Sequence, residues 1–153
     1  MTTNSAIRDK AFAVFEDIWL TQDNITHYQG LLEKQLLINR CSKCGYWVYP
    51  HRPICPECLS WELTPKPVHG KGTVYMFTLI RQGRRIDEGT YDPPRVVAAI
   101  ELEEQTGLRY LSTVTGIAPS EVIVGMPVEI SWSADLADPY PTFVPSAPDG
   151  ESE

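Results

Sequence analysis

The chain contains four cysteines, which form two C-x-x-C pairs inside one short window. Cys41 and Cys44 make the first pair, Cys55 and Cys58 make the second, and ten residues separate the pairs. Thiolate sulfur is a preferred ligand of Zn²⁺, and four sulfurs complete the tetrahedral coordination of a structural site. Such a closed site leaves no coordination position for a substrate. The pattern therefore predicts a structural Zn²⁺ bound by all four cysteines.

Other uses of paired cysteines fit this chain less well. Disulfides suit small secreted domains, whereas the first ten residues, MTTNSAIRDK, contain no apolar signal segment. A redox C-x-x-C usually occurs singly at the start of a helix. An iron site of the rubredoxin kind is a further alternative, but rubredoxin places its two pairs much farther apart. We expect a colourless zinc protein.

Candidate catalytic groups are few. His27, His51 and His69 are isolated along the chain, and the sequence has no G-x-S-x-G motif. No cysteine remains as a nucleophile if the metal takes all four. The basic residues near the cysteines are expected to offset the charge of a four-thiolate site, and these are Arg40, Lys43, His51 and Arg52. We therefore predict no catalytic residue for the chain alone, while a contribution across a shared active site stays open.

Composition narrows the class of protein further. The chain has 153 residues, 42% of them hydrophobic, and a net charge of -7. These values are typical of a globular domain, and no apolar run is long enough for a membrane span. Because phosphate neutralisation supplies most non-specific affinity for nucleic acid, the negative charge argues against that partner. We expect a cytoplasmic protein that binds neither membranes nor nucleic acid.

The first forty residues predict two helices. Phe12, Phe15, Ile18 and Trp19 recur at helical spacing and form one apolar stripe. Asn24 is a candidate N-cap for a second helix, which Gly30 would weaken. Two interpretations stay open at this point: the helices pack on their own core, or their aromatic side chains form a docking surface.

The remaining chain predicts β-structure. Short β-rich runs at residues 36–40 and 46–49 flank the first cysteine pair, and Gly45 is suited to the positive φ that such a turn requires. Four longer runs follow, at residues 72–81, 95–103, 108–114 and 127–132. Residues 116–125 are expected to hold a short helix or turn. Tyr140 and Phe143 are expected to attach the Pro-rich tail to the barrel.

These elements predict a mainly β fold with N-terminal helices. The helical segment and a zinc ribbon come first, and a five-stranded OB-fold barrel follows. The expected boundaries are 1–38 for the helical segment, 39–67 for the ribbon, 68–145 for the barrel and 146–153 for a disordered tail.

Four stretches carry a resemblance to a known family: RCSKCGYWVYPHRPICPECLS, GKGTVYMFTLIR, VVAAIELEEQTGLRYLSTVTG and VIVGMPVEISW. The chain resembles OB-fold proteins that carry a rubredoxin-like zinc ribbon and are associated with acyl-CoA. The resemblance implies a non-catalytic accessory subunit of a thiolase-superfamily enzyme. The implied partner is a thiolase, or a thiolase-like aldolase that cleaves a β-hydroxyacyl-CoA, as in steroid side-chain degradation. Ribbon and barrel would help to hold the acyl-CoA.

Binding of CoA requires cations for its phosphates. Arg81, Arg84, Arg85 and Arg95 gather between two predicted strands, and this makes them the candidate phosphate ligands. The alternative interpretation is a solvated loop whose charge is balanced by nearby acidic residues, namely Asp87, Glu88 and Asp92.

A second functional hypothesis is a protein that binds single-stranded nucleic acid. OB barrels often do so through aromatic side chains on which bases stack. Tyr75, Phe77 and Tyr110 lie on predicted barrel strands and are the candidates for this role. The charge of -7 argues against this hypothesis.

Overall fold

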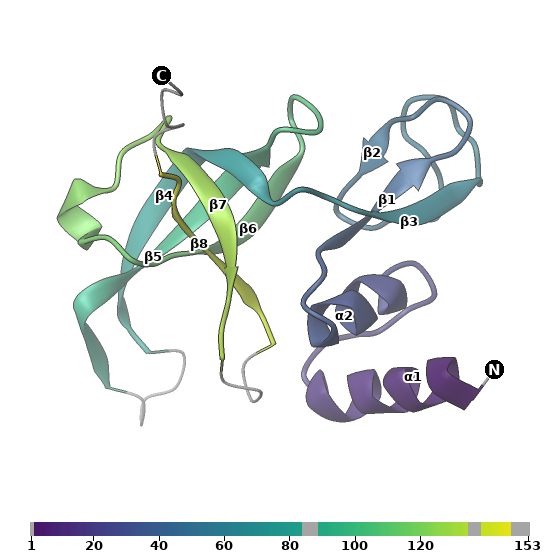
Figure 1. The fold of residues 1–153 in the computed structure, drawn as a ribbon, viewed down its shortest axis with the longest axis horizontal. Coiled ribbons are helices and arrows are strands. Elements are labelled where there is room, and N and C mark those ends of the chain that lie inside the picture. The colour runs from purple at the N-terminus through teal and green to yellow at the C-terminus, as the bar shows by residue number, and fades with distance from the viewer. Residues whose placement is uncertain (1, 84–88, 135–138, 148–153) are drawn as a thin grey trace, which may run out of the picture. The chain divides into compact units, whose positions relative to one another are not determined.

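The structure is a computed structural model that describes residues 2–83, 89–134 and 139–147, with side chains from residue 5 onward. It divides the chain into two compact units (Figure 1). The helix–ribbon unit comprises Met1–His69 and Ala134–Tyr140, and the barrel unit comprises Gly70–Ser133 and Pro141–Glu153. Among the described residues, no helix has the length and apolar character needed to cross a membrane.

Helix α1 (Thr2–Val14) is shorter than the apolar stripe suggests. Ala11 and Phe15 are buried, and the Phe15 ring packs against Tyr28 with 4.8 Å between ring centroids. Phe12 and Trp19 are 49% and 86% exposed, so only part of the apolar stripe packs in the core. The reason is that the helix ends at Val14, and Trp19 lies in the connection that follows.

Helix α2 (Ile25–Leu32) packs between α1 and the strand that follows it (Figure 1). Asn24 occupies the N-cap position, but its Oδ1 accepts a hydrogen bond from the Thr21 N–H at 2.7 Å instead of capping the helix. Gly30 is buried, and a Cβ there would lie 2.8 Å from the Gln35 carbonyl oxygen and 2.9 Å from Leu37 Cγ. Glycine therefore allows the chain to cross α2 closely.

The ribbon is a three-stranded sheet in the order β2-β1-β3. Its strands are β1 (Leu37–Cys41), β2 (Trp47–Val48) and β3 (Leu63–Pro67). The sequence did not predict β3, because Pro65 and Pro67 disfavour a strand. The structure accommodates both prolines because β3 is an edge strand, paired with β1 alone.

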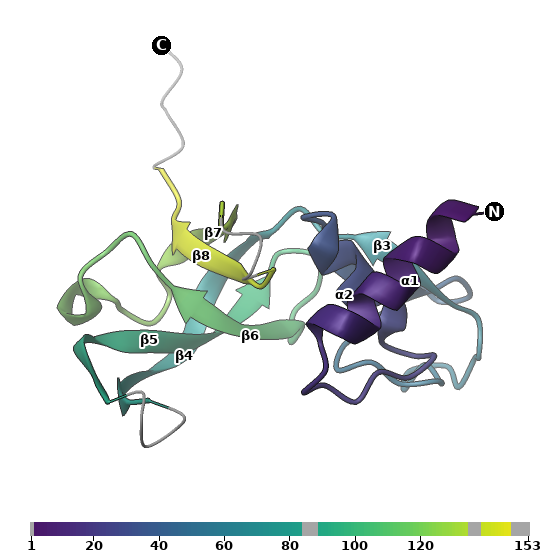
Figure 2. The ribbon, with the colours of Figure 1, turned by 90° about the horizontal axis from the view of Figure 1, so that it is seen from below.

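The barrel unit closes in the order β4-β5-β6-β8-β7, with β7 paired to β4 (Figures 1 and 2). Strands β6 and β8 are parallel, and every other neighbouring pair is antiparallel. This is the five-stranded OB-fold that the sequence predicted. The strands are β4 (Lys71–Gln82), β5 (Thr90–Leu102), β6 (Arg109–Val114), β7 (Pro127–Trp132) and β8 (Pro141–Pro145). The expected short helix is the 3₁₀-helix η2 (Pro119–Glu121).

The barrel core comes from the side chains that alternate along these strands. Every second residue of β5 is buried from Val96 to Leu102, Tyr110 and Val114 are buried in β6, and the other strands add single apolar side chains. The buried residues of this core include Val74, Val96, Ala98, Ile100, Leu102, Tyr110, Val114, Val128 and Phe143. Phe143 therefore does more than attach the tail, because its strand β8 completes the barrel.

Two details of the barrel differ from the prediction. Strand β5 begins at Thr90, ahead of the expected start at residue 95. Pro93 and Pro94 do not end the strand, because they lie in an irregular stretch between two positions at which β4 and β5 pair. Their missing N–H groups therefore break no ladder hydrogen bond. Tyr140 lies outside β8 and belongs to the helix–ribbon unit, where its ring packs on Phe15 with 5.6 Å between ring centroids.

Gly30 offers a test of this packing, because helix propensity and the structure predict opposite effects. Propensity alone predicts that Gly30→Ala stabilises α2 by about 1 kcal/mol. We expect the reverse, a loss of about 1–2 kcal/mol in the free energy of unfolding, because the new Cβ would overlap the Gln35 carbonyl. Urea unfolding of Gly30→Ala measures this, with Gln29→Ala on the same helix as control. A stabilised Gly30→Ala protein would contradict the close crossing.

Candidate metal centre

The first cysteine pair lies in a tight turn between β1 and β2. The Gly45 N–H donates to the Cys41 carbonyl at 2.9 Å, and the Cys41 N–H donates to the Tyr46 carbonyl at 2.8 Å. Gly45 has φ +79°, as the sequence predicted, and glycine adopts this left-handed conformation without steric cost. The turn thereby brings the Cys41 and Cys44 sulfurs to the same side.

The second cysteine pair repeats this turn with the same hydrogen bonds. The Leu59 N–H donates to the Cys55 carbonyl at 2.9 Å, and the Cys55 N–H donates to the Ser60 carbonyl at 2.9 Å. Leu59 takes the place of the glycine and has φ +60°. The two turns therefore share one hydrogen-bond pattern, and they face each other across the ribbon.

All four cysteine sulfurs lie within 4.8 Å of one another. The Cys41 and Cys58 sulfurs are 3.6 Å apart, and so are the Cys44 and Cys55 sulfurs. Around a tetrahedral zinc with Zn–S bonds of about 2.3 Å, neighbouring sulfurs are separated by about 3.8 Å. The quartet therefore fits a single tetrahedral metal ion, and among the described residues it is the one group of possible metal ligands that comes together.

The four sulfurs of the quartet influence one another's ionisation. The backbone N–H of Cys44 is the main cause that lowers the pKa of Cys41 to about 6. The Tyr46 N–H favours the Cys44 thiolate in the same way, but desolvation and the three neighbouring sulfurs outweigh it and raise the pKa of Cys44 to about 12. Four thiolates can coexist at this distance only around a multivalent cation.

Arg40 lies beside the first turn and places a positive charge near the quartet. Its Nε donates to the Gly45 carbonyl at 2.9 Å, and its guanidinium lies over the Trp47 ring at 5.2 Å. Arg40 is therefore held against the first cysteine turn, and its role in offsetting the charge of the site stays a prediction.

His51 was expected to share that role, and this expectation is wrong. Its ring packs on His27 at 4.8 Å and on Tyr49 at 5.4 Å, and neither ring nitrogen has a hydrogen-bond partner among the described residues. Burial, followed by the nearby His27, lowers the pKa of His51 to about 4. The imidazole is therefore neutral at pH 7 and adds no charge to the metal site.

His27 belongs to the same packed group. Burial lowers its pKa below the ordinary value, while its Nδ1 lies 2.9 Å from the Leu37 carbonyl oxygen. Tyr49 completes the group, and desolvation by burial raises the pKa of Tyr49 to about 12. These rings join α2 to the ribbon as uncharged packing groups.

The candidate phosphate ligands are only partly described. Arg84 and Arg85 lie outside the described residues. Arg81 and Arg95 are exposed on β4 and β5, where Arg95 is paired with Ile80, the residue before Arg81. The structure therefore brings two of the four arginines to neighbouring strands of the barrel unit, and the Arg95 guanidinium lies 5.4 Å from the centroid of the Tyr91 ring.

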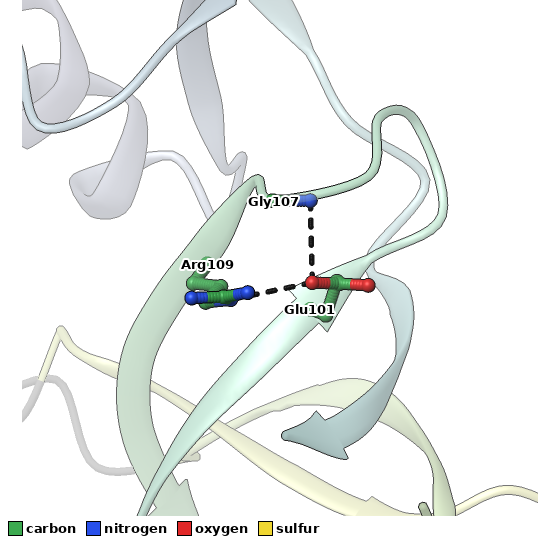
Figure 3. Close-up of polar contacts among 3 residues, drawn as sticks. All are labelled: Glu101, Gly107 and Arg109. Atoms are coloured by element: carbon green, nitrogen blue, oxygen red, sulfur yellow. Dashed lines mark hydrogen bonds and ion pairs between the residues drawn. The ribbon is translucent and has the colours of Figure 1, made fainter. Parts of the chain in front are cut away.

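A third arginine, which the sequence did not single out, has a well-defined environment (Figure 3). Arg109 Nε lies 3.3 Å from Glu101 Oε2, and the same oxygen accepts a hydrogen bond from the Gly107 N–H at 3.2 Å. The guanidinium lies 3.5 Å from the centroid of the Tyr75 ring. Glu101 and Arg109 are paired across β5 and β6. The prediction of a β-hairpin around Gly107 would therefore have placed these two residues opposite each other.

The aromatic side chains proposed for stacking nucleobases do not form a platform. Tyr75 is 44% exposed, but Arg109 covers one face of its ring. Tyr110 is buried beside Phe143, with 6.5 Å between ring centroids. Phe77 is paired with the buried Ala98 and shares its inward side. The three rings therefore do not share one exposed face, as stacking of successive bases requires.

Two family models match consecutive parts of the chain. The first is described as "ChsH2, rubredoxin-like zinc ribbon domain" and matches residues 29–64. The second is described as "ChsH2, C-terminal OB-fold domain" and matches residues 65–133. Together they cover the ribbon and almost all of the barrel strands.

Two curated proteins illustrate the range of relatives. A DUF35 domain-containing scaffold protein of Methanocaldococcus jannaschii is 34% identical over 107 residues, which is 69% of this chain and 73% of that protein. A "Probable enoyl-CoA hydratase alpha subunit" of Thermomonospora curvata is 32% identical over 134 residues, or 87% of this chain. The match spans only 40% of the length of that second protein.

Two solved structures share the fold. A chain of the "Ltp2-ChsH2(DUF35) aldolase" superposes with a TM-score of 0.71 at 31% identity, over 84% of this chain and 98% of that one. A DUF35-family protein from Sulfolobus solfataricus superposes with a TM-score of 0.60 at 17% identity, over 95% of this chain and 97% of that one. The second likeness concerns the fold alone.

Proposed function

We propose that this chain is the accessory subunit of a thiolase-superfamily enzyme, because it belongs to the ChsH2/DUF35 family of proteins with a zinc ribbon and an OB-fold. The single observation that carries this proposal is the match to nearly the whole length of a chain in the Ltp2-ChsH2(DUF35) aldolase. The partner would be a thiolase-like aldolase or a thiolase, and its substrate an acyl-CoA.

In this proposal the partner performs the bond cleavage. A retro-aldol reaction of a β-hydroxyacyl-CoA removes the hydroxyl proton and breaks the bond between the α and β carbons. The β carbon becomes the carbonyl product, and the bonding electrons stay on the α carbon, which takes up a proton to give the shortened acyl-CoA. A steroid side chain would be one such acyl group. In this chain, the cysteines share one site and the His27 and His51 rings pack on each other. The groups best suited to nucleophilic or acid–base chemistry thus make structural contacts, which supports an accessory role.

The metal in this proposal is a structural Zn²⁺ held by Cys41, Cys44, Cys55 and Cys58. The sulfur spacing supports it, because the two measured separations of 3.6 Å suit a tetrahedral site. When bound, zinc would supply the positive charge that keeps four thiolates together and would close the ribbon. Four protein sulfurs leave no position for substrate.

The CoA phosphates are proposed to bind near Arg81 and Arg95, with Arg84 and Arg85 as further candidates from the sequence. Arg81 and Arg95 are exposed and occupy neighbouring positions on β4 and β5, which supports this assignment. Guanidinium groups bind phosphate through charge-assisted hydrogen bonds.

The zinc proposal predicts the effect of removing one sulfur. Wild-type protein should be colourless and contain about one zinc per chain. Cys41→Ser should lose most of this zinc, because three thiolates and a hydroxyl bind Zn²⁺ more weakly. Elemental analysis by mass spectrometry measures the metal content. Lys66→Ala, which changes an exposed residue on the ribbon strand β3, is the control. Full zinc content in Cys41→Ser would overturn the ligand assignment.

The partner proposal predicts a stable complex. Co-expressed with a thiolase-like aldolase, the chain should elute with it in size-exclusion chromatography. The complex should also cleave a β-hydroxyacyl-CoA faster than the aldolase alone, which separation of the CoA thioesters by liquid chromatography detects. Two separate elution peaks together with an unchanged cleavage rate would contradict the proposal.

The arginine proposal predicts weaker CoA binding. Replacing both Arg81 and Arg95 by Ala should lower the affinity of the complex for CoA by roughly tenfold to a hundredfold, since hydrogen bonds to charged groups contribute about 1.5–3 kcal/mol. Isothermal titration with CoA measures the change. Lys10→Ala, at an exposed position on α1, provides the control. An affinity within twofold of wild type would show that these two arginines do not bind the CoA phosphates.

A further inference from the structure

The two turns that hold the cysteines provide an internal comparison. Counted from the second cysteine of each pair, Gly45 corresponds to Leu59 and Trp47 corresponds to Trp61. Both turns close with the same pair of backbone hydrogen bonds, all between 2.8 and 2.9 Å. The first turn therefore shows what the metal site requires, and departures from it in the second turn need another explanation.

Leu59 is the first departure. It has φ +60°, close to the +79° of Gly45, but a leucine side chain makes this left-handed conformation unfavourable. The side chain is 72% exposed, so packing within the chain does not offset the strain. Nothing in the metal site calls for a leucine here, since glycine serves in the first turn. A strained, exposed apolar residue indicates a role outside the chain.

Trp61 is the second departure. Trp47, its counterpart, is 8% exposed and lies under the Arg40 guanidinium, whereas Trp61 is 70% exposed. The backbone around Trp61 is fixed, because its carbonyl accepts the Leu63 N–H at 2.9 Å and the Glu62 N–H donates to Ser60 Oγ at 3.1 Å. Leu59 and Trp61 thus stand two residues apart on a rigid turn.

The charges around this pair indicate what kind of surface it meets. Glu57 and Glu62 flank Leu59 and Trp61, both are exposed, and no basic residue lies between Cys55 and Glu62. An acidic border repels anionic lipid surfaces and nucleic acid. The same border complements a protein pocket that is apolar at its centre and basic at its edge.

We propose that Leu59 and Trp61 are the docking contact through which the ribbon binds its partner subunit, in an apolar pocket edged by basic residues. This inference rests on the proposed accessory function and specifies the surface that performs it. A tryptophan with a neighbouring aliphatic side chain, held on a rigid turn, is typical of the few interface residues that supply most of the affinity. The metal site then holds the two side chains in the orientation in which they enter the pocket of the partner.

The test uses the full chain, loaded with zinc, and a thiolase-like aldolase as the binding probe. Leu59→Gly and Trp61→Ala should each weaken the complex by tenfold or more in isothermal titration. Zinc content should stay at the wild-type level in both variants. Leu59→Gly should unfold at a temperature equal to or above wild type, because it releases the strain at that position. Asparagine tolerates a positive φ, so Leu59→Asn keeps the turn conformation without the added backbone freedom of glycine. It should weaken binding as well, which would show that the loss comes from the missing leucine side chain.

Lys66→Ala, at an exposed position on the ribbon strand β3 away from both cysteine turns, is the matched control. It should bind the probe as wild type does. If wild-type protein forms the complex and the Leu59 and Trp61 variants bind equally well, the docking contact is wrong while the accessory function stands. If wild-type protein forms no complex, both proposals fall. A wild-type dimer that Trp61→Ala converts to monomer, or binding of Trp61 to vesicles of anionic phospholipid, would also overturn the docking contact.

Discussion

The helix–ribbon unit depends on the mutual approach of four sulfur atoms within 4.8 Å. Ionised sulfurs at this distance repel one another, whereas a divalent cation coordinated by all four sulfurs would link the two turns. Without such a cross-link the three-stranded sheet is small, since β2 has two residues and β3 contains two prolines. In our proposal, the metal bound by the quartet therefore contributes to the folding of the ribbon.

The described strands of the barrel unit close on themselves, because β7 pairs with β4, and the buried Phe143 on β8 lies in the interior. This division separates the two roles in our account. The ribbon presents rigid side chains, and the barrel carries the exposed arginines on β4 and β5.

The sequence predicted the features that depend on local spacing. Paired cysteines, alternating apolar residues and turn glycines specify the quartet and the OB-fold strands without reference to distant contacts. It missed the features that distant contacts decide. Strand β3 forms in spite of Pro65 because β1 offers it an edge, and Phe143 is a core residue because β6 and β7 both pair with β8.

The same distinction holds within the candidate site. The spacing of the cysteines predicts the quartet, but it does not predict that Leu59 is strained or that Trp61 is exposed where Trp47 is buried. Likewise, the charge of His51 could not be judged before its packing against His27 was known. Side-chain exposure and protonation depend on neighbours that the chain brings together only on folding.

Our central claim is that a structural metal holds a ribbon whose purpose is to dock a partner. The most direct measurement compares the affinity of zinc-loaded and zinc-stripped protein for a thiolase-like aldolase by isothermal titration. We predict that chelation abolishes binding while the OB-fold barrel stays folded, and that added Zn²⁺ restores it. Equal affinity with and without zinc would contradict the account.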